Sequence, residues 1–282
     1  MMDLRVFGST GLRVSAVGMG CSRLGSFLTS TSDKEGASTV RLALDSGINF
    51  FDTSNIYAQG DSERLLGSAL GNDRSRAVLT TKAGREFSRG IRLAARIKRP
   101  LKFALRLAPS LRNRAVRTRS DNLSLDFTYE HLTAALDASL RRLRTDWVDI
   151  FMLHAPPIEV IADAELFHQL GRLTQSGKIR SLGVSVAEAE HAAPVVKLPE
   201  VSSVQVPISQ SRKDVLVPLL SQLRQRGLGV VGREVFGDIS QQGGDSARRS
   251  VLREAVELHG LDVVLIGMSS REHLRSNLAA LA

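Results

Sequence analysis

The sequence has few of the residues that mark disulfide-rich and metal-binding proteins. Its 282 residues include a single cysteine, Cys21, and six histidines that are scattered along the chain. One cysteine cannot form an internal disulfide, which excludes a disulfide-stabilised secreted domain, and we expect a reducing, cytoplasmic location. Because neither the cysteine nor the histidines show metal-ligand spacing, we expect no metal site.

Long apolar segments and aromatic residues are also scarce. No stretch approaches the roughly 18 consecutive apolar residues of a transmembrane helix, so we expect no membrane span. The segment 1–5 lacks the apolar core of a signal peptide, and we expect none. Aromatic residues make up only 5% of the chain, which gives little indication of a stacking pocket for flat substrates.

The net charge of +9 comes from one segment. Residues 85–119 hold 12 lysines or arginines and one acid, whereas the rest of the chain holds 26 basic and 28 acidic residues. This segment lies in a basic insert that we place at about 85–127, with helical spacing over 91–107. Within 85–119 the only aromatics are Phe87 and Phe103, too few to stack on bases, so no nucleic acid is expected. We expect a solvated insert; the alternatives are that it binds an anionic substrate, a protein partner or an anionic membrane surface.

Short apolar runs alternate with longer stretches of helical periodicity, which is the pattern of parallel strands joined by helices. The expected strands are 16–20, 48–52, 77–82, 147–153, 179–186, 201–207, 228–232 and 263–267. The expected helices are 39–46, 62–70, 129–143, 164–175, 188–196, 215–225, 247–259 and 272–281. Eight such units predict one α/β domain over 1–282 that closes into a (β/α)₈ TIM barrel, with the basic insert after the third strand.

A Gly-Ser-Thr-Gly turn at 8–11 predicts a small N-terminal β-hairpin over 4–14, ahead of the barrel. The rival fold is an open doubly wound sheet. Its glycine-rich fingerprint is missing, because Arg23 stands where the third glycine would follow Gly18 and Gly20. The sequence therefore favours the barrel.

Four polar residues stand at or just after the ends of predicted strands. Asp52, Lys82 and His154 each close an apolar run, and Tyr57 follows Asp52 in the next loop. Each has an ordinary explanation alone, such as a turn cap, a solvated lysine or a core histidine. In a barrel, however, these strand ends share the catalytic face, so together they indicate an active site.

These residue types suit the reduction of a carbonyl group. Hydride addition to the carbonyl carbon creates an alkoxide that needs a proton, and Tyr57 can supply it. We expect Lys82 to lower the pKa of the phenol, and Asp52 to pair with that lysine. The imidazole of His154 can donate to the carbonyl oxygen and orient it.

At this point the chain resembles the aldo-keto reductase superfamily over nearly its whole length. The resemblance is carried by GLRVS (11–15), GINFFDT (47–53) with Tyr57, LTTK (79–82), SLRRLRTDWVD (139–149), LH (153–154) and GKIRSLGVS (177–185). It implies a (β/α)₈ barrel, NADPH as the usual hydride donor, and a catalytic tetrad matching Asp52, Tyr57, Lys82 and His154 in which the tyrosine is the general acid. The substrate would be a small aldehyde or ketone.

The resemblance also implies a set of cofactor contacts. Ser185 and Gln205 match the residues that hold the nicotinamide carboxamide, and Arg233 stands where many members stack a tyrosine on the nicotinamide. At the 2′-phosphate position His273 replaces the usual arginine, so NADPH is expected and NADH is retained as the alternative. The residues implied to bind the cofactor are Gly20, Asp52, Ser185, Gln205, Arg233, Gly267, Met268, Arg271, Arg275 and Asn277.

Two other functions stay open. A barrel aldolase could use Lys82 as its Schiff-base lysine. A non-catalytic regulatory subunit of the same fold could bind NADP(H) without turnover, as potassium-channel β subunits do. The leading hypothesis is an NAD(P)H-dependent oxidoreductase.

Overall fold

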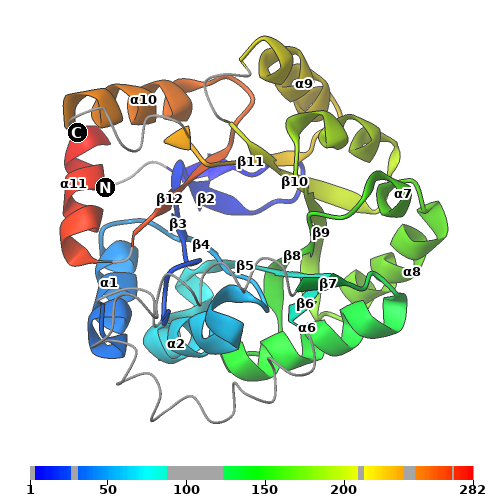
Figure 1. The fold of residues 1–282 in the computed structure, drawn as a ribbon, viewed down its shortest axis with the longest axis horizontal. Helices are drawn as coiled ribbons and strands as arrows, with labels where there is room; N and C mark the ends of the chain where they lie inside the picture. Colours follow the sequence, from blue (N-terminus) through cyan, green and yellow to red (C-terminus); the bar gives the residue numbers. More distant parts are fainter. Residues whose placement is uncertain are drawn as a thin grey trace.

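A closed barrel of eight parallel strands forms the centre of the molecule (Figure 1). The computed structural model describes residues 4–26, 31–87, 123–208, 213–237, 245–268 and 270–281. The strands are β3 (Val17–Gly20), β4 (Phe50–Asp52), β5 (Val78–Ala83), β8 (Val148–His154), β9 (Ile179–Ser185), β10 (Val201–Pro207), β11 (Gly229–Arg233) and β12 (Val263–Gly267). Their order around the barrel is β10-β11-β12-β3-β4-β5-β8-β9. The (β/α)₈ prediction is confirmed, with every expected strand present.

Helices surround the barrel (Figure 1). They are α1 (Asp33–Asp45), α2 (Asp61–Leu70), α6 (Tyr129–Leu143), α8 (Ala164–Gln175), α9 (Lys213–Gln225), α10 (Asp245–Glu257) and α11 (Arg271–Leu281). Both α6 and α8 have the predicted bounds, because a polar side chain caps each start. The hydroxyl of Thr128 accepts from the backbone N of His131 at 3.3 Å, and the carboxylate of Asp163 accepts from that of Leu166 at 3.1 Å.

Other helical segments differ from the prediction. Helix α1 begins at Asp33 rather than at Thr39, because the Ser32 hydroxyl caps it by accepting from the backbone N of Glu35 at 3.1 Å. The expected helix 188–196 is a 3-10 helix, η3 (Ala189–Lys197), which contains a proline that cannot donate a backbone hydrogen bond. The single turn α7 (Ile158–Ile161) was not predicted.

The N-terminal hairpin closes the end of the barrel opposite the strands' carboxyl ends. Its strands β1 (Leu4–Val6) and β2 (Arg13–Ser15) are antiparallel, which confirms the prediction. In the turn between them Phe7 is fully buried, and its ring centroid lies 5.9 Å from that of Phe50 at the start of β4. The backbone N of Ser9 donates to the Gly227 carbonyl at 2.8 Å. The other end of the barrel is therefore left for chemistry.

The basic insert begins directly after β5, as predicted, and its two ends pair. Strands β6 (Arg85–Phe87) and β7 (Leu123–Leu125) form an antiparallel ribbon that was not predicted, since three-residue strands carry little periodicity. Before it, Gly84 has φ 102°, and a Cβ there would lie 2.0 Å from the Phe127 ring. The expected helical segment 91–107 lies outside the described residues.

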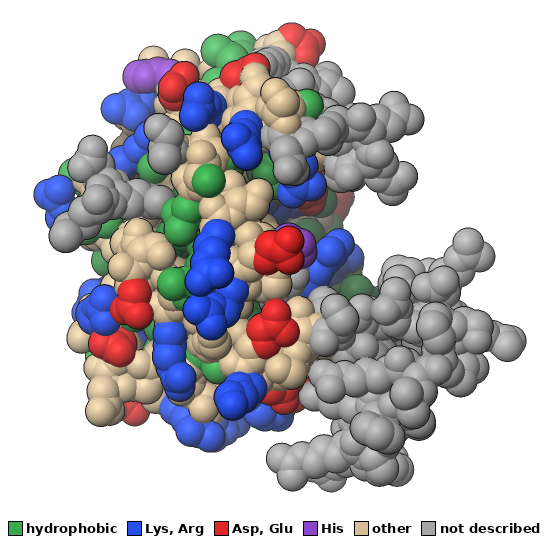
Figure 2. Space-filling model, turned by 90° about the vertical axis from the view of Figure 1, so that its left-hand side faces the viewer, with side chains coloured by type: hydrophobic (Ala, Val, Ile, Leu, Met, Phe, Trp, Pro, Cys, Tyr) green, Lys and Arg blue, Asp and Glu red, His purple; other side chains and the backbone are tan. Residues whose placement is uncertain are grey.

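The described surface carries charges of both signs. On the side where α1 and α11 lie, Lys and Arg side chains gather towards the centre, with Asp and Glu side chains on both flanks (Figure 2). Among the helices of the described ranges, none combines the length and the apolar character needed to span a bilayer.

A buried carboxylate holds the amino-terminal ends of β5 and β8 together. Asp149 is 1% exposed, and its Oδ2 accepts from Arg74 Nη2 and from the backbone N of Leu79, both at 2.9 Å. Its Oδ1 lies 3.1 Å from Arg180 Nη1. Both guanidinium groups also lie over the Trp147 ring, at 4.7 and 5.6 Å from its centroid. This cluster is far from the catalytic end, so its role is to stabilise the barrel.

We therefore expect Asp149→Asn to destabilise the protein without changing its chemistry. The variant leaves the partly buried Arg74 without its counter-ion, which costs about 3 kcal/mol. A matched control is Asp137→Asn, because the Asp137–Lys178 pair is 41% and 42% exposed and contributes about 1 kcal/mol or less. The urea unfolding midpoint should fall clearly for Asp149→Asn alone; equal midpoints for the two variants would contradict this assignment.

Candidate active site

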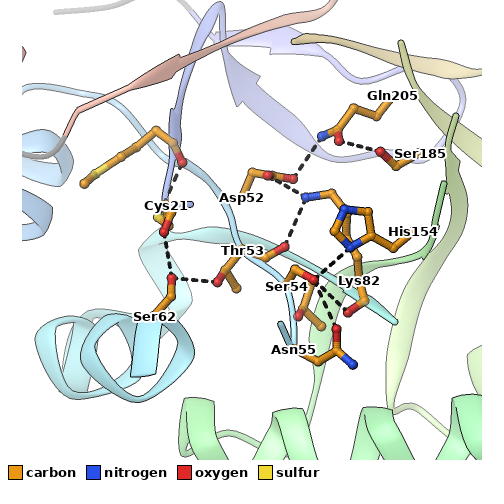
Figure 3. A network of polar contacts seen from close by, with 12 residues as sticks. Cys21, Asp52, Thr53, Ser54, Asn55, Ser62, Lys82, His154, Ser185 and Gln205 are labelled. Carbon is orange, nitrogen blue, oxygen red and sulfur yellow. Dashed lines mark hydrogen bonds and ion pairs between the residues drawn. The ribbon is translucent and has the colours of Figure 1, made fainter. Parts of the chain in front are cut away.

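Polar side chains from five neighbouring strands meet at the carboxyl end of the barrel. Asp52, His154 and Ser185 are the last residues of β4, β8 and β9, whereas Lys82 and Gln205 lie near the ends of β5 and β10. Because these strands are parallel neighbours, their carboxyl ends share one rim. Figure 3 shows these side chains converging.

The centre of the group is a buried ion pair. Lys82 Nζ lies 2.6 Å from Asp52 Oδ1 and donates to the backbone carbonyl of Thr53 at 3.1 Å. The two side chains are 0% and 5% exposed. The pairing of Lys82 with Asp52, expected from the sequence, is present in the structure.

The ion pair continues into two residues expected at the cofactor. Gln205 Nε2 donates to the second Asp52 oxygen at 2.9 Å, and Ser185 Oγ donates to Gln205 Oε1 at 2.7 Å (Figure 3). All three side chains are buried. A continuous chain of hydrogen bonds therefore runs from Ser185 to Lys82.

Tyr57 lies beside this ion pair, at the start of the 3-10 turn η1 (Tyr57–Gly60). Lys82 Nζ is 5.2 Å from the centroid of its ring, and the His154 ring meets it edge-on at 5.8 Å. The next two residues, Ala58 and Gln59, have φ of 48° and 59°, a conformation that is costly for residues other than glycine. The local chain thus holds a strained turn that brings the phenol to the ion pair.

A second set of hydrogen bonds fixes the loop that carries Tyr57. Thr53 Oγ1 and Ser62 Oγ are 2.9 Å apart, and Ser62 Oγ donates to the Cys21 carbonyl at 2.8 Å (Figure 3). The Cys21 thiol itself is fully buried, and burial raises its pKa. It stays protonated and takes no part in the polar chain.

The expectation that the pKa of Tyr57 is lowered is wrong. Burial raises the pKa of the phenol more than the charge of Lys82 and its contact with the hydroxyl lower it, so the net shift is upward from 10.0. Tyr57 is therefore protonated at neutral pH. The sequence predicted the charge of Lys82 near the phenol, but it did not predict how deeply the phenol is buried.

The pKa values of Lys82 and His154 shift in opposite directions. Burial lowers the pKa of Lys82, but Asp52 and Tyr57 together raise it more, so the ammonium is charged at neutral pH. Burial lowers the pKa of His154 well below 6.5, and the nearby charges of Lys82, Arg85 and Arg233 add to this effect. The imidazole is therefore neutral at neutral pH.

Ser54 belongs to the site but was not among the residues predicted from the sequence. Its hydroxyl is fully buried and lies 3.0 Å from His154 Nδ1, 3.2 Å from Asn55 Oδ1 and 3.3 Å from the Lys82 carbonyl (Figure 3). The residues predicted at strand ends are titratable, whereas Ser54 is neutral and lies in a loop. Its position directly after Asp52-Thr53 was the available signal.

Arg233 lies at the same end of the barrel as these site residues. Its Nη2 donates to the carbonyls of Val186 and Ala187 at 2.6 and 3.0 Å, and its Nη1 pairs with Glu234. Its guanidinium is thus fixed by backbone and counter-ion, close to the phenol of Tyr57.

The remaining residues expected at the cofactor lie at the ends of β12 and β3 and on α11. Gly267 and Gly20 are neighbours in register, and a Cβ on Gly267 would meet no atom within 4 Å. Met268, the next residue, is buried. On α11, Arg271 and Arg275 are exposed and Asn277 is buried; none of the three belongs to the hydrogen-bonded chain around Asp52.

In the described ranges, no group of three or more His, Cys, Asp or Glu side chains is placed to hold a metal ion. The site itself brings together an uncharged phenol, a neutral imidazole and a charged lysine–aspartate pair. Such a set can donate a proton to a buried oxygen atom that becomes negatively charged.

Comparisons with known proteins agree with this fold. The sequence model of the Aldo/keto reductase family matches residues 16–240. An L-galactose dehydrogenase of Arabidopsis thaliana is 29% identical, and the match covers 99% of this chain and 88% of the relative. The uncharacterized oxidoreductase YqkF of Bacillus subtilis is 28% identical, and the match covers 78% of this chain and 61% of the relative.

Among solved structures, the holo form of aldo-keto reductase AKR11C1 from Bacillus halodurans superposes with a TM-score of 0.76 at 24% identity, covering 100% of this chain and 91% of that one. An aldo-keto reductase of Klebsiella pneumoniae in complex with NADPH gives 0.69 at 22% identity, covering 100% and 90%. The chain belongs to the aldo/keto reductase family.

Proposed function

We propose that this protein is an NAD(P)H-dependent oxidoreductase that reduces an aldehyde or ketone to an alcohol, with Tyr57 as the proton donor. The observation that carries the proposal is the buried Lys82–Asp52 pair, 2.6 Å long, beside the phenol and the imidazole. Oxidoreductases among the relatives and an NADPH complex among the structural neighbours support it. An expected cytoplasmic location is part of this proposal.

Ser185 and Gln205 fit the carboxamide of a nicotinamide. After its bond to Asp52, the Gln205 amide keeps one free hydrogen, and the Ser185 oxygen keeps free lone pairs after donating to Gln205. One free donor and one free acceptor complement a carboxamide group. The open space above Gly267 leaves room for a ligand at the end of β12. When bound, the reduced nicotinamide supplies the hydride.

NADPH is the proposed donor, with NADH as the alternative. Arg271 and Arg275 stand one turn apart on the exposed side of α11, where their charges can attract a 2′-phosphate. A solvated helix face is the ordinary explanation for the same two residues, so the preference needs measurement.

Each residue of the tetrad has a defined task in the reduction. Tyr57 keeps its proton at neutral pH and gives it to the oxygen that gains charge as the carbonyl is reduced. Lys82 stays charged and stabilises the phenolate that remains, and Asp52 holds Lys82 in place. If the Ser54 hydroxyl donates to Nδ1 of His154, its shortest contact, the hydrogen of the ring lies on Nε2 and can bind the carbonyl oxygen. Ser54 is then a positioning residue.

The aldolase alternative fits this site less well. A Schiff-base lysine needs a neutral amine, usually produced by burial without a counter-ion. Here Lys82 pairs with Asp52, donates to the Thr53 carbonyl and keeps its proton. This geometry therefore argues against attack of the Lys82 nitrogen on a carbonyl carbon to form a Schiff base.

Titration of nicotinamide fluorescence with NADPH and NADH, followed by turnover of a simple aldehyde, tests the proposal. We expect binding and turnover together. Cofactor binding without turnover of any aldehyde would favour the regulatory subunit. A lysine adduct trapped by borohydride would favour the aldolase. Either result would overturn the proposed reduction.

A further inference from the structure

Arg85 stands at the rim of the site on a fixed backbone. It opens β6 directly after Gly84 and pairs with Leu125 of β7. Its carbonyl accepts from Asn55 Nδ2 at 3.1 Å, and Asn55 belongs to the loop that carries Tyr57. Arg85 is therefore tied to the catalytic loop by its main chain.

The side chain of Arg85 is directed towards the catalytic end. Successive residues of a strand point to opposite faces. The next residue, Glu86, lies near α6, with Oε1 3.9 Å from His131 Nε2. Arg85 therefore projects away from α6, and its charge is near enough to lower the pKa of His154.

The guanidinium of Arg85 has no anionic partner among the residues that the structure describes. Its Nε is buried and makes no hydrogen bond. The other charges at this rim are accounted for: Lys82 pairs with Asp52, and Arg233 pairs with Glu234 and lies near Glu188. Within the described part of the chain, Arg85 beside the imidazole is thus left without a counter-ion.

An unpartnered, partly buried guanidinium is costly, and its planar fork matches the oxygens of carboxylates and phosphates. On the basis of the proposed reductase function, we propose that the substrate is an anionic carbonyl compound and that Arg85 binds its carboxylate or phosphate group. His154 and Tyr57 then face the carbonyl oxygen of the same molecule. The anion supplies the counter-ion that the described residues do not.

Matched substrates test this with the complete protein. The first pair is 4-carboxybenzaldehyde and its neutral isostere 4-carbamoylbenzaldehyde, and the second is glyceraldehyde 3-phosphate and glyceraldehyde. We expect kcat/KM to be about tenfold or more higher for an anionic member than for its neutral partner, since charge-assisted bidentate pairs are strong. The pair that shows the larger ratio identifies carboxylate or phosphate as the preferred anion. Equal values within both pairs would overturn the proposal.

Variants of Arg85 test whether this residue causes the preference for anionic aldehydes. Arg85→Gln should raise KM for the anionic aldehyde about tenfold and leave the neutral one unchanged, because only the anion loses a partner. Arg85→Lys should recover part of the difference, since it restores charge without the fork. Arg76→Gln is the control, because Arg76 is half exposed at the other end of the barrel and pairs with Asp73. Equal losses on both aldehydes with Arg85→Gln would show a structural role and contradict the proposal.

Binding without turnover separates this inference from the proposed function. Calorimetric titration of the NADPH-bound protein with 4-carboxybenzoate, a dianion without a carbonyl to reduce, should give a Kd about tenfold lower for the wild type than for Arg85→Gln. If no aldehyde is reduced but this difference persists, the proposed reduction fails and the anion site stands. Equal Kd values would reject the anion site even if neutral aldehydes are reduced.

Discussion

We expect Tyr57→Phe to lower kcat by about 10²- to 10⁴-fold while leaving the affinity for the cofactor unchanged. The variant removes the hydroxyl that supplies the proton and keeps the ring that packs against His154. The control is Tyr129→Phe, because Tyr129 is the chain's other tyrosine and lies on α6. Steady-state kinetics and fluorescence titration measure the two effects separately. Near-normal turnover of Tyr57→Phe would show that another group donates the proton.

The pH dependence of the wild type provides a second measure of Tyr57. Burial raises the pKa of its phenol above 10.0, so the acid form that reduction requires is fully present at neutral pH and is lost only above that raised value. His154 has already lost its proton at neutral pH, because burial lowers its pKa well below 6.5. The kcat for reduction should therefore be constant through the neutral range. A decline centred near neutrality would contradict the assigned proton donor.

We expect Lys82→Met to remove most activity and also to destabilise the fold by about 3–5 kcal/mol. The Asp52 side chain is 5% exposed, and without Lys82 its charge is buried; among the described residues, the Gln205 amide remains as its side-chain partner. The phenolate that forms at Tyr57 also loses its nearest cation. The control is Lys178→Met, because Lys178 is 42% exposed and makes an ordinary surface pair.

The double variant Asp52→Asn/Lys82→Met separates the two losses. Replacing the carboxylate by an amide removes the uncompensated charge, so much of the stability should return. Activity should stay low, because the cation beside Tyr57 is still missing. Urea unfolding and kcat are measured on Lys82→Met, Lys178→Met and the double variant, and the changes in stability and activity are compared. Recovery of activity along with stability would mean that Lys82 serves only to support the fold.

The sequence predicted the barrel because each strand is a short apolar run and most helices have polar caps or glycines at their ends. The bounds of α8 follow from Asp163 before it and Ser176-Gly177 after it. Helix α1 was predicted too short because its first turn is polar, and β6 and β7 were missed because their pairing depends on a contact between distant segments. Such contacts leave no local pattern.

The sequence predicted most of the titratable residues of the active site, but it predicted little of their surroundings. Asp52, Lys82 and His154 end apolar runs, which places them at one end of the barrel. The neutral Ser54 gives no such signal, although it lies 3.0 Å from His154. The upward shift in the pKa of Tyr57 depends on burial by residues far apart in the sequence, and no spacing rule reveals it.

Transfer of deuterium from the nicotinamide to the product tests the central claim most directly. With NADPH labelled at the transferable C4 position and an aldehyde, product analysis by mass spectrometry and NMR should find one deuterium on the new alcohol carbon. The labelled product should fall with kcat in Tyr57→Phe. An alcohol formed without label, or no alcohol at all from a protein that binds NADPH, would contradict the account.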